Sequence, residues 1–318
     1  MPEIKIVENP SELGAGTRGS SLGIGALQVV ARQRKDDFFA LYERFHVEHQ
    51  NDMLDFPTIY NYAKRIDGLA EVYQNTVDIL NHIYATKDFP LVLSGDHSCA
   101  AGTVAGIKRA FPNKRLGVIW IDAHADLHTP YTTPSGNIHG MPLSVILGID
   151  NKENAINVPN PNVVTMWAEL LQIGAPSPKI KIQDLVYIGV RDKEPLEEDY
   201  MEKHGIRNFT VQEVHEKGCE KIAEEVKTKL SECEIVYVSF DVDSMDPEEV
   251  SNGTGTPSPD GLTIFEATSL MVNLAAWKKT CCIEFVEINP CLDNKINKMA
   301  EVAFDILKVT THQIENRI

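Results

Sequence analysis

Residues 117–126 read GVIWIDAHAD, an apolar run followed at once by two aspartates and a histidine. Residues 117–121 are uncharged and rich in β-branched and aromatic side chains, which is typical of a buried parallel strand. Similar runs occupy residues 91–93, 185–190, 235–240 and 282–288. The sequence therefore predicts a set of buried strands, at least one of which ends in a polar cluster.

Helical segments separate these runs. Apolar spacing that suits a helix packed on a sheet covers residues 60–83, 100–111, 219–230 and 265–276. The alternation of strands and helices predicts an α/β fold. No internal repeat, low-complexity tract or Gly/Ser-rich linker divides the chain, so a single domain over residues 1–318 is the simpler interpretation.

Composition narrows the class of partner. The chain carries 46 acidic and 30 basic residues, a formal net charge of −16, which repels nucleic acid and anionic membranes but not a cationic substrate. The N-terminal MPEIKIVENP has charges where a secretory signal needs apolar residues, and no segment approaches a membrane span of about 18 apolar residues. A cytoplasmic protein with reduced cysteines is predicted.

Three of the predicted strand ends carry side chains of the kinds that bind metals. They are Ser94-Gly95-Asp96-His97-Ser98, Asp122-Ala123-His124-Ala125-Asp126 and Asp241-Val242-Asp243. A single Asp or His in a loop is more often a turn former or a solvated side chain. Alternate residues of an extended chain point the same way, however, and ligands of open parallel sheets bind beyond the carboxyl ends of strands. These side chains are therefore expected to converge.

The candidate ligands suit two divalent ions. Four carboxylates and two imidazoles are available: Asp122, Asp126, Asp241, Asp243, His97 and His124. This oxygen-rich set favours Mn²⁺, with zinc, cobalt or nickel as substitutes. Two ions about 3.5–4 Å apart can share a water and lower its pKa for attack on an electrophilic carbon. A metal that only holds loops together is the alternative, but a chain of this length needs none to fold.

Motifs spread along the chain resemble those of the arginases. SGDHS, DAHAD, SGNIHGMP, SFDVDSMDP, GTGTP and VEINP occur in the order and approximate spacing of that family. The resemblance covers nearly the whole chain. It is strongest from residue 90 to 310 and weaker in the glycine-rich residues 14–25. It implies a three-layer αβα sandwich with a mostly parallel central sheet.

The resemblance also implies a ligand set and a reaction. One manganese would be held by His97, Asp122, Asp126 and Asp241. The other would be held by His124, Asp122, Asp241 and Asp243. A hydroxide bridging the two ions would attack the guanidinium carbon of L-arginine, with Asp126 accepting a hydrogen bond or proton, to give L-ornithine and urea.

Three further residues take roles from the same resemblance. His139 would be the proton shuttle, Glu287 would grip the guanidinium and Thr256 would shape that end of the cleft. A histidine exchanges protons near neutrality, and an amine leaving group must collect one, so the role of His139 is chemically sound. Alone, however, His139 would more often be an incidental surface residue, and Glu287 could bond only to backbone.

Two loops bear on the substrate. Residues 128–137, HTPYTTPSGN, resemble the arginase loop that binds the α-carboxylate, and agmatine-cleaving relatives generally lack its SGN element. Residues 191–197, RDKEPLE, resemble the acidic loop that meets the α-ammonium. The predicted substrate-binding residues are His128, Ser135, Asn137, Asp192, Glu194, Glu197 and Thr256.

The chain departs from the arginase pattern at three positions. His128 replaces the usual asparagine, Glu194 replaces an aspartate, and Ser94 replaces the glycine before Gly95. An imidazole can still donate to a carboxylate, whereas the longer Glu194 could displace the head group at a cost on the order of 1 kcal/mol. L-Arginine is the expected substrate, and agmatine, guanidinobutyrate or a modified arginine is the alternative.

Other classes fit the sequence less well. A dinuclear phosphoesterase would carry a GNH[DE] element, which is missing from the sequence, and a deacetylase of related architecture would use one zinc. A scaffold protein would have lost at least one of the six ligands. A homo-oligomer, trimer or hexamer, is expected, although Phe265 stands where some trimeric relatives use an interface arginine.

Overall fold

A computed structural model describes residues 2–318, which build one eight-stranded sheet. The strands are β1 (Ile4–Asn9), β2 (Glu43–His46), β3 (Phe89–Ser94), β4 (Leu116–Ile121), β5 (Leu185–Ile188), β6 (Arg207–Phe209), β7 (Ile235–Asp241) and β8 (Thr280–Val286). Their order is β2-β1-β3-β8-β7-β4-β5-β6, and every pair of neighbours is parallel. All carboxyl ends therefore lie at one edge.

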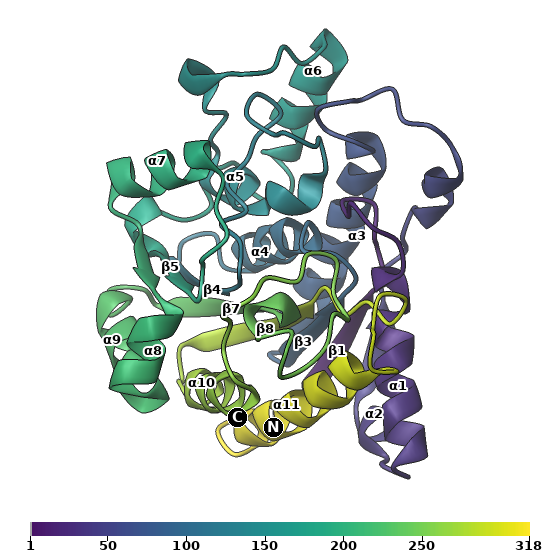
Figure 1. The fold of residues 1–318 in the computed structure, drawn as a ribbon, viewed down its shortest axis with the longest axis vertical. Coiled ribbons are helices and arrows are strands. Elements are labelled where there is room, and N and C mark those ends of the chain that lie inside the picture. Colours follow the sequence, from purple (N-terminus) through teal and green to yellow (C-terminus); the bar gives the residue numbers. More distant parts are fainter. Residues whose placement is uncertain (1) are drawn as a thin grey trace.

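Helices cover both faces of the sheet (Figure 1). One layer contains α3 (Ile66–Ala85), α4 (Cys99–Ala110), α5 (Pro142–Leu147), α6 (Pro161–Leu170) and α7 (Pro195–His204). The other contains α1 (Gly23–Gln33), α2 (Phe38–Leu41), α8 (Val211–Lys217), α9 (Cys219–Lys229), α10 (Ile264–Ala275) and α11 (Lys298–Glu315). The predicted αβα sandwich is confirmed, with a sheet that is parallel throughout.

The strands divide their side chains between two cores. In β4, Val118 and Trp120 pack with the α3 and α4 layer, whereas Ile119 and Ile121 pack with the α10 and α11 layer. Because successive side chains of a strand point to opposite faces, a strand buried on both sides reads as a continuous apolar run. This is why residues 117–121 could be recognised as a central strand.

Some predicted boundaries were wrong. The helix expected from residue 60 begins at Ile66, directly after Arg65 adopts a left-handed φ of 59°. The strand expected to reach residue 288 ends at Val286, so Glu287 lies beyond it. The strands β1, β2 and β6 were not predicted, because charged side chains interrupt their apolar residues. No helix within residues 2–318 has the length and apolar character to cross a membrane.

Candidate active site

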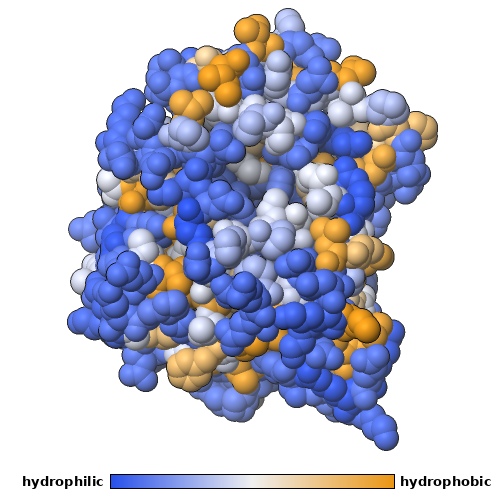
Figure 2. Space-filling view, viewed as in Figure 1, coloured by the Kyte–Doolittle hydropathy of each residue, from blue (hydrophilic) through white to orange (hydrophobic). Residues whose placement is uncertain are grey.

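Four neighbouring strands, β3, β8, β7 and β4, bring their carboxyl ends together beneath a cavity of ≈ 350 Å³. Figure 2 shows a recess near the middle of a largely hydrophilic face. All the predicted site residues line the cavity: His97, Asp122, His124, Asp126, His128, Ser135, Asn137, His139, Asp192, Glu194, Glu197, Asp241, Asp243, Thr256 and Glu287. Residues far apart in sequence thus meet because their strands are adjacent.

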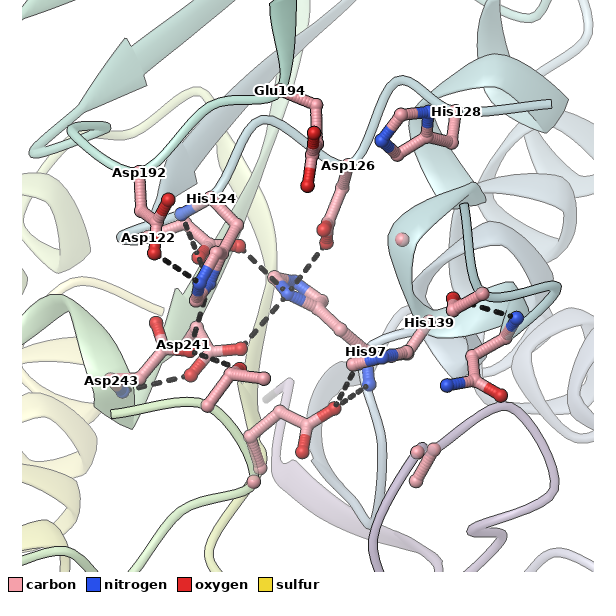
Figure 3. Close-up of a pocket in the computed structure, with 18 of the residues that line it drawn as sticks. His97, Asp122, His124, Asp126, His128, His139, Asp192, Glu194, Asp241 and Asp243 are labelled. Carbon is pink, nitrogen blue, oxygen red and sulfur yellow. Dashed lines mark hydrogen bonds and ion pairs between the residues drawn. The ribbon is translucent and has the colours of Figure 1, made fainter. Parts of the chain in front are cut away.

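An inner cluster, defined as His97, Asp122, Asp126 and Asp241, surrounds one imidazole nitrogen. His97 Nδ1 lies 3.0 Å from Asp122 Oδ2, 3.1 Å from Asp241 Oδ2 and 3.2 Å from Asp126 Oδ2. All four side chains are buried. Figure 3 shows His97 pointing up among the three carboxylates.

An outer cluster, defined as Asp122, His124 and Asp243, lies beside the first. His124 Nδ1 is 3.1 Å from Asp243 Oδ2 and 3.5 Å from Asp122 Oδ1. The ligand atoms of His97, Asp122 and Asp241 are close enough together to hold a metal ion, and so are those of the outer cluster. Asp122 belongs to both groups and contributes one oxygen to each cluster.

The chemistry of these side chains fits a divalent cation. His97 Nδ1 and Asp126 Oδ2 are buried and form no hydrogen bond within residues 2–318. Burial, together with the neighbouring carboxylates, raises the pKa values of Asp126 and Asp241 well above their ordinary range. Because buried like charges repel, a cation between them would stabilise the ionised cluster. The orphaned atoms therefore fit a metal site better than a hydrogen-bonded core.

Local backbone features position the inner cluster. A Cβ on Gly95 would lie 2.3 Å from the carbonyl oxygen of Ser11, so only glycine permits the turn that follows β3. Asp126 has a left-handed φ of 52°, a conformation that costs on the order of 1–3 kcal/mol and is common at functional sites.

Trp120 supports two ligands at once but was not predicted. Its Nε1 donates to Asp122 Oδ2 at 2.8 Å, and its ring stacks on His97 with centroids 4.0 Å apart. The signal was its position near the end of β4, two residues before Asp122, because alternate side chains of an extended chain point the same way.

His139 and Glu287 lie together on the side of the inner cluster away from His124. His139 Nδ1 is 3.5 Å from Glu287 Oε1, which also accepts the backbone N–H of His97 at 3.0 Å. Burial alone would lower the pKa of His139, but its hydrogen bond to Glu287 and the surrounding carboxylates raise it to about 9. Glu287 has a left-handed φ of 68° that turns it back over the strand ends.

The opposite end of the cavity carries the predicted head-group residues, with His128 and Glu194 above Asp126 in Figure 3. His128 Nε2 is buried, lies 3.6 Å from Glu197 Oε2 and forms no hydrogen bond within residues 2–318. Asn137 Oδ1 accepts from Lys64 Nζ at 3.0 Å. Both Glu197 oxygens accept backbone N–H groups, from Leu127 and Glu194, so Glu197 also holds the loop together.

Thr256 and an N-terminal loop complete the cavity. Thr256 Oγ1 donates to Asp243 Oδ2 at 3.2 Å, so it contacts the outer cluster directly. Ala15, Gly16 and Thr17 also line the cavity. They were not predicted, and the only indication was the weak resemblance of the glycine-rich residues 14–25 to an arginase loop.

Comparisons with known proteins agree with this geometry. The family model described as "Arginase family" matches residues 3–311. The arginase of Bacillus caldovelox is 35% identical, over 96% of this chain and 97% of its own length. A crystal structure of Bacillus subtilis arginase superposes with a TM-score of 0.81 at 33% identity, covering 97% of this chain and 98% of that one. Entamoeba histolytica arginase in complex with L-ornithine gives a TM-score of 0.79 at 26% identity, over 99% of both chains. The chain therefore belongs to the arginase family and is a ureohydrolase.

Proposed function

We propose that this ureohydrolase cleaves the guanidinium group of L-arginine to L-ornithine and urea, using two manganese ions per chain. The observation that carries the proposal is the pair of ligand clusters that share Asp122 at one end of a cavity whose other end is lined by polar head-group residues. Similarity to arginases over nearly the full chain supports the choice of substrate.

In this proposal, His97, Asp122, Asp126 and Asp241 hold one ion, and His124, Asp122, Asp241 and Asp243 hold the other. Ligands that are mainly carboxylates suit manganese better than a softer metal. When bound, such a pair of ions would supply a nucleophilic water of lowered pKa. The protein contributes the fixed, buried geometry of the ligands.

Glu287 is proposed to orient the guanidinium. Its Oε1 already accepts from the His97 backbone and faces His139, which leaves Oε2 available to accept a guanidinium N–H. A carboxylate held at one edge of a planar cation fixes the orientation of the cation and so the face that is open to attack. Asp126 has a buried Oδ2 without a hydrogen-bond partner within residues 2–318, which would be free to accept a hydrogen bond or proton in this proposal.

His139 is proposed to supply the proton that the leaving amine needs. With a pKa of about 9, the imidazole is largely protonated near neutral pH and can act as an acid. Its side chain is 20% exposed, so it can regain a proton from solvent after each turnover.

The polar end of the cavity can bind the head group of an amino acid substrate, but a second class of substrate also fits it. The free Nε2 of His128 can donate to an α-carboxylate, and Ser135 and Asn137 add polar groups beside it. The same end carries three carboxylates, Asp192, Glu194 and Glu197. Such acids can bind the α-ammonium of an amino acid, and they can equally bind the cationic tail of the alternative substrate, a guanidino compound such as agmatine.

The test is urea release by manganese-loaded protein from L-arginine, agmatine, guanidinobutyrate and N-hydroxy-arginine at one pH. Strong preference for L-arginine supports the proposal. Preference for agmatine would move the substrate to the alternative and leave the reaction unchanged. No urea from any of them, with two metals bound per chain, would overturn the proposed reaction.

We further propose a single domain that forms a cytoplasmic homo-oligomer, trimer or hexamer. One continuous sheet supports the single domain. Phe265 is 77% exposed on α10, so the position where some trimeric relatives use an interface arginine is accessible to a partner subunit. Light scattering coupled to size exclusion would test this, and a monomer at micromolar concentration would contradict it.

A further inference from the structure

A carboxylate lies inside the sheet, below the inner cluster. Glu284 on β8 is fully buried, and no Lys, Arg or His within residues 2–318 forms an ion pair with it. Burial raises its pKa, as expected for an acid removed from water. A buried acid without a cation is costly, so its surroundings must offer some compensation.

Two hydroxyl groups compensate Glu284. Ser94 Oγ donates to Oε1 at 2.5 Å, and Tyr237 Oη donates to Oε2 at 2.7 Å. Ser94 stands where the arginase pattern has a glycine, so the departure at this position supplies one of the two donors. Because each carboxylate oxygen accepts a hydrogen bond, the two hydroxyls stabilise the ionised form of Glu284.

The same group of side chains reaches a predicted metal ligand. Ser239 is the register partner of Glu284 across β7 and β8 and shares a strand face with Tyr237. Because the two side chains are two residues apart on one face of β7, they lie next to each other beside Glu284. Ser239 Oγ is in turn hydrogen-bonded to His97 Nε2 at 2.7 Å. A row of polar groups therefore runs from Glu284 through Tyr237 and Ser239 to His97.

The row of polar groups meets His97 at Nε2, the ring nitrogen that faces away from the inner cluster. Its Nδ1 faces the three carboxylates of the inner cluster, so Nε2 is the nitrogen that carries a proton toward Ser239 when Nδ1 binds a cation. Metal-binding histidines are commonly oriented and made more basic by a carboxylate beyond the other ring nitrogen. Here the carboxylate would act through two hydroxyls.

We infer that Glu284 is a positioning residue that, through Tyr237 and Ser239, orients the His97 imidazole and raises the affinity of the inner cluster for its divalent ion. The inference rests on the proposed function only in requiring that the inner cluster binds a metal. The outer cluster has no buried, hydrogen-bonded counterpart within residues 2–318, because the carboxylate near the other nitrogen of His124 is the exposed Asp192, 3.8 Å away and beyond hydrogen-bond distance. Glu284 should therefore act on one ion and not on both.

The test is Mn²⁺ binding to the metal-free full chain, measured by electron paramagnetic resonance and by competition with a chelator. Glu284→Gln keeps the shape and removes the charge. We expect it to weaken one of the two sites about 10- to 100-fold, the usual effect of changing a group that supports a ligand. The other site should change less than about threefold. Tyr237→Phe should weaken the same site, and its effect should not add to that of Glu284→Gln.

Tyr84→Phe is the matched control, because its hydroxyl donates to the Cys281 carbonyl and lies outside the row. If both sites weaken equally in Glu284→Gln, or neither does while the wild type binds two ions, the inference is wrong. If the wild type binds no Mn²⁺, the proposed function itself fails. Should Glu284→Gln not fold, Tyr237→Phe decides, since it breaks the row while keeping the acid.

Discussion

The inner and outer clusters use the same kinds of side chain but differ in what surrounds them. The His97 side chain is 2% exposed, stacked on Trp120 and hydrogen-bonded to Ser239. The His124 side chain is 24% exposed and faces the open end of the cavity, near the largely solvated Asp192. The difference indicates that the inner cluster is fixed before a metal binds, whereas the outer cluster can adjust to substrate.

The largest effect is expected where the two clusters meet. Asp122→Asn removes the oxygen charge that both clusters share, so both ions should be lost. Because a metal pair supplies several kcal/mol of stabilisation and 1.36 kcal/mol is tenfold in rate, turnover should fall by about 1,000-fold. Metal content and urea release measure this. Asp305→Asn, at an exposed ion pair with Arg34, is the control, and equal activity of the two variants would contradict the account.

Replacing each histidine separately distinguishes the clusters. His97→Asn should abolish the inner ion and also destabilise the metal-free protein by about 2 kcal/mol, because the stacked, buried ring is lost. His124→Asn should keep the inner ion and change the stability of the metal-free protein by less than about 1 kcal/mol. Urea denaturation of metal-free samples provides the measurement. Equal destabilisation would mean that the outer cluster is as rigid as the inner one.

A chelator should remove the two ions at different rates. On addition of a chelator, the ion of the exposed outer cluster should leave first, and the ion of the inner cluster should follow about tenfold more slowly. Thermal stability should drop mainly in the second phase, because a tightly bound ion stabilises the folded state in proportion to the logarithm of its affinity. Stopped-flow chelation would show this, and a single phase that releases both ions would count against it.

The smallest effect is expected beyond the outer cluster. His128→Asn changes the head-group end without contacting either cluster, so metal binding should be unchanged. If His128 Nε2 binds the α-carboxylate, an amide can replace it, and KM for L-arginine should stay within about tenfold of wild type or improve. Steady-state kinetics measures KM. Complete loss of activity would show that His128 has another role.

The strand ends were the part of the site that sequence could predict. Asp122, His124 and Asp126 follow a run buried on both faces, and such runs are visible in a sequence because neither face is polar. Their convergence with His97 and Asp241 was expected because ligands of a parallel sheet bind beyond the carboxyl ends of its strands. The sequence did not show which strands are neighbours, and the structure supplies that order. The structure brings all of the predicted ligands together at one edge.

The supporting residues could not be predicted in the same way. Trp120 and Ser239 look like ordinary members of core strands. The stacking of Trp120 on His97 and the position of Ser239 beside Glu284 depend on which strands are neighbours, which spacing along the chain does not show. Charged side chains interrupt the apolar residues of β1 and β6, so their sequences carry little signal of a strand. Glu284 lies inside a predicted strand, and the sequence does not indicate which side chains of the neighbouring strands contact it.

The most direct test of the two-cluster account is anomalous diffraction from crystals of the full chain grown with Mn²⁺, with a second data set at substoichiometric metal. The account predicts two peaks at saturation, one among His97, Asp126 and Asp241 and one beside His124 and Asp243. At low metal, the peak near His97 should be filled first. A single peak at saturation, or preferential filling near His124, would contradict it.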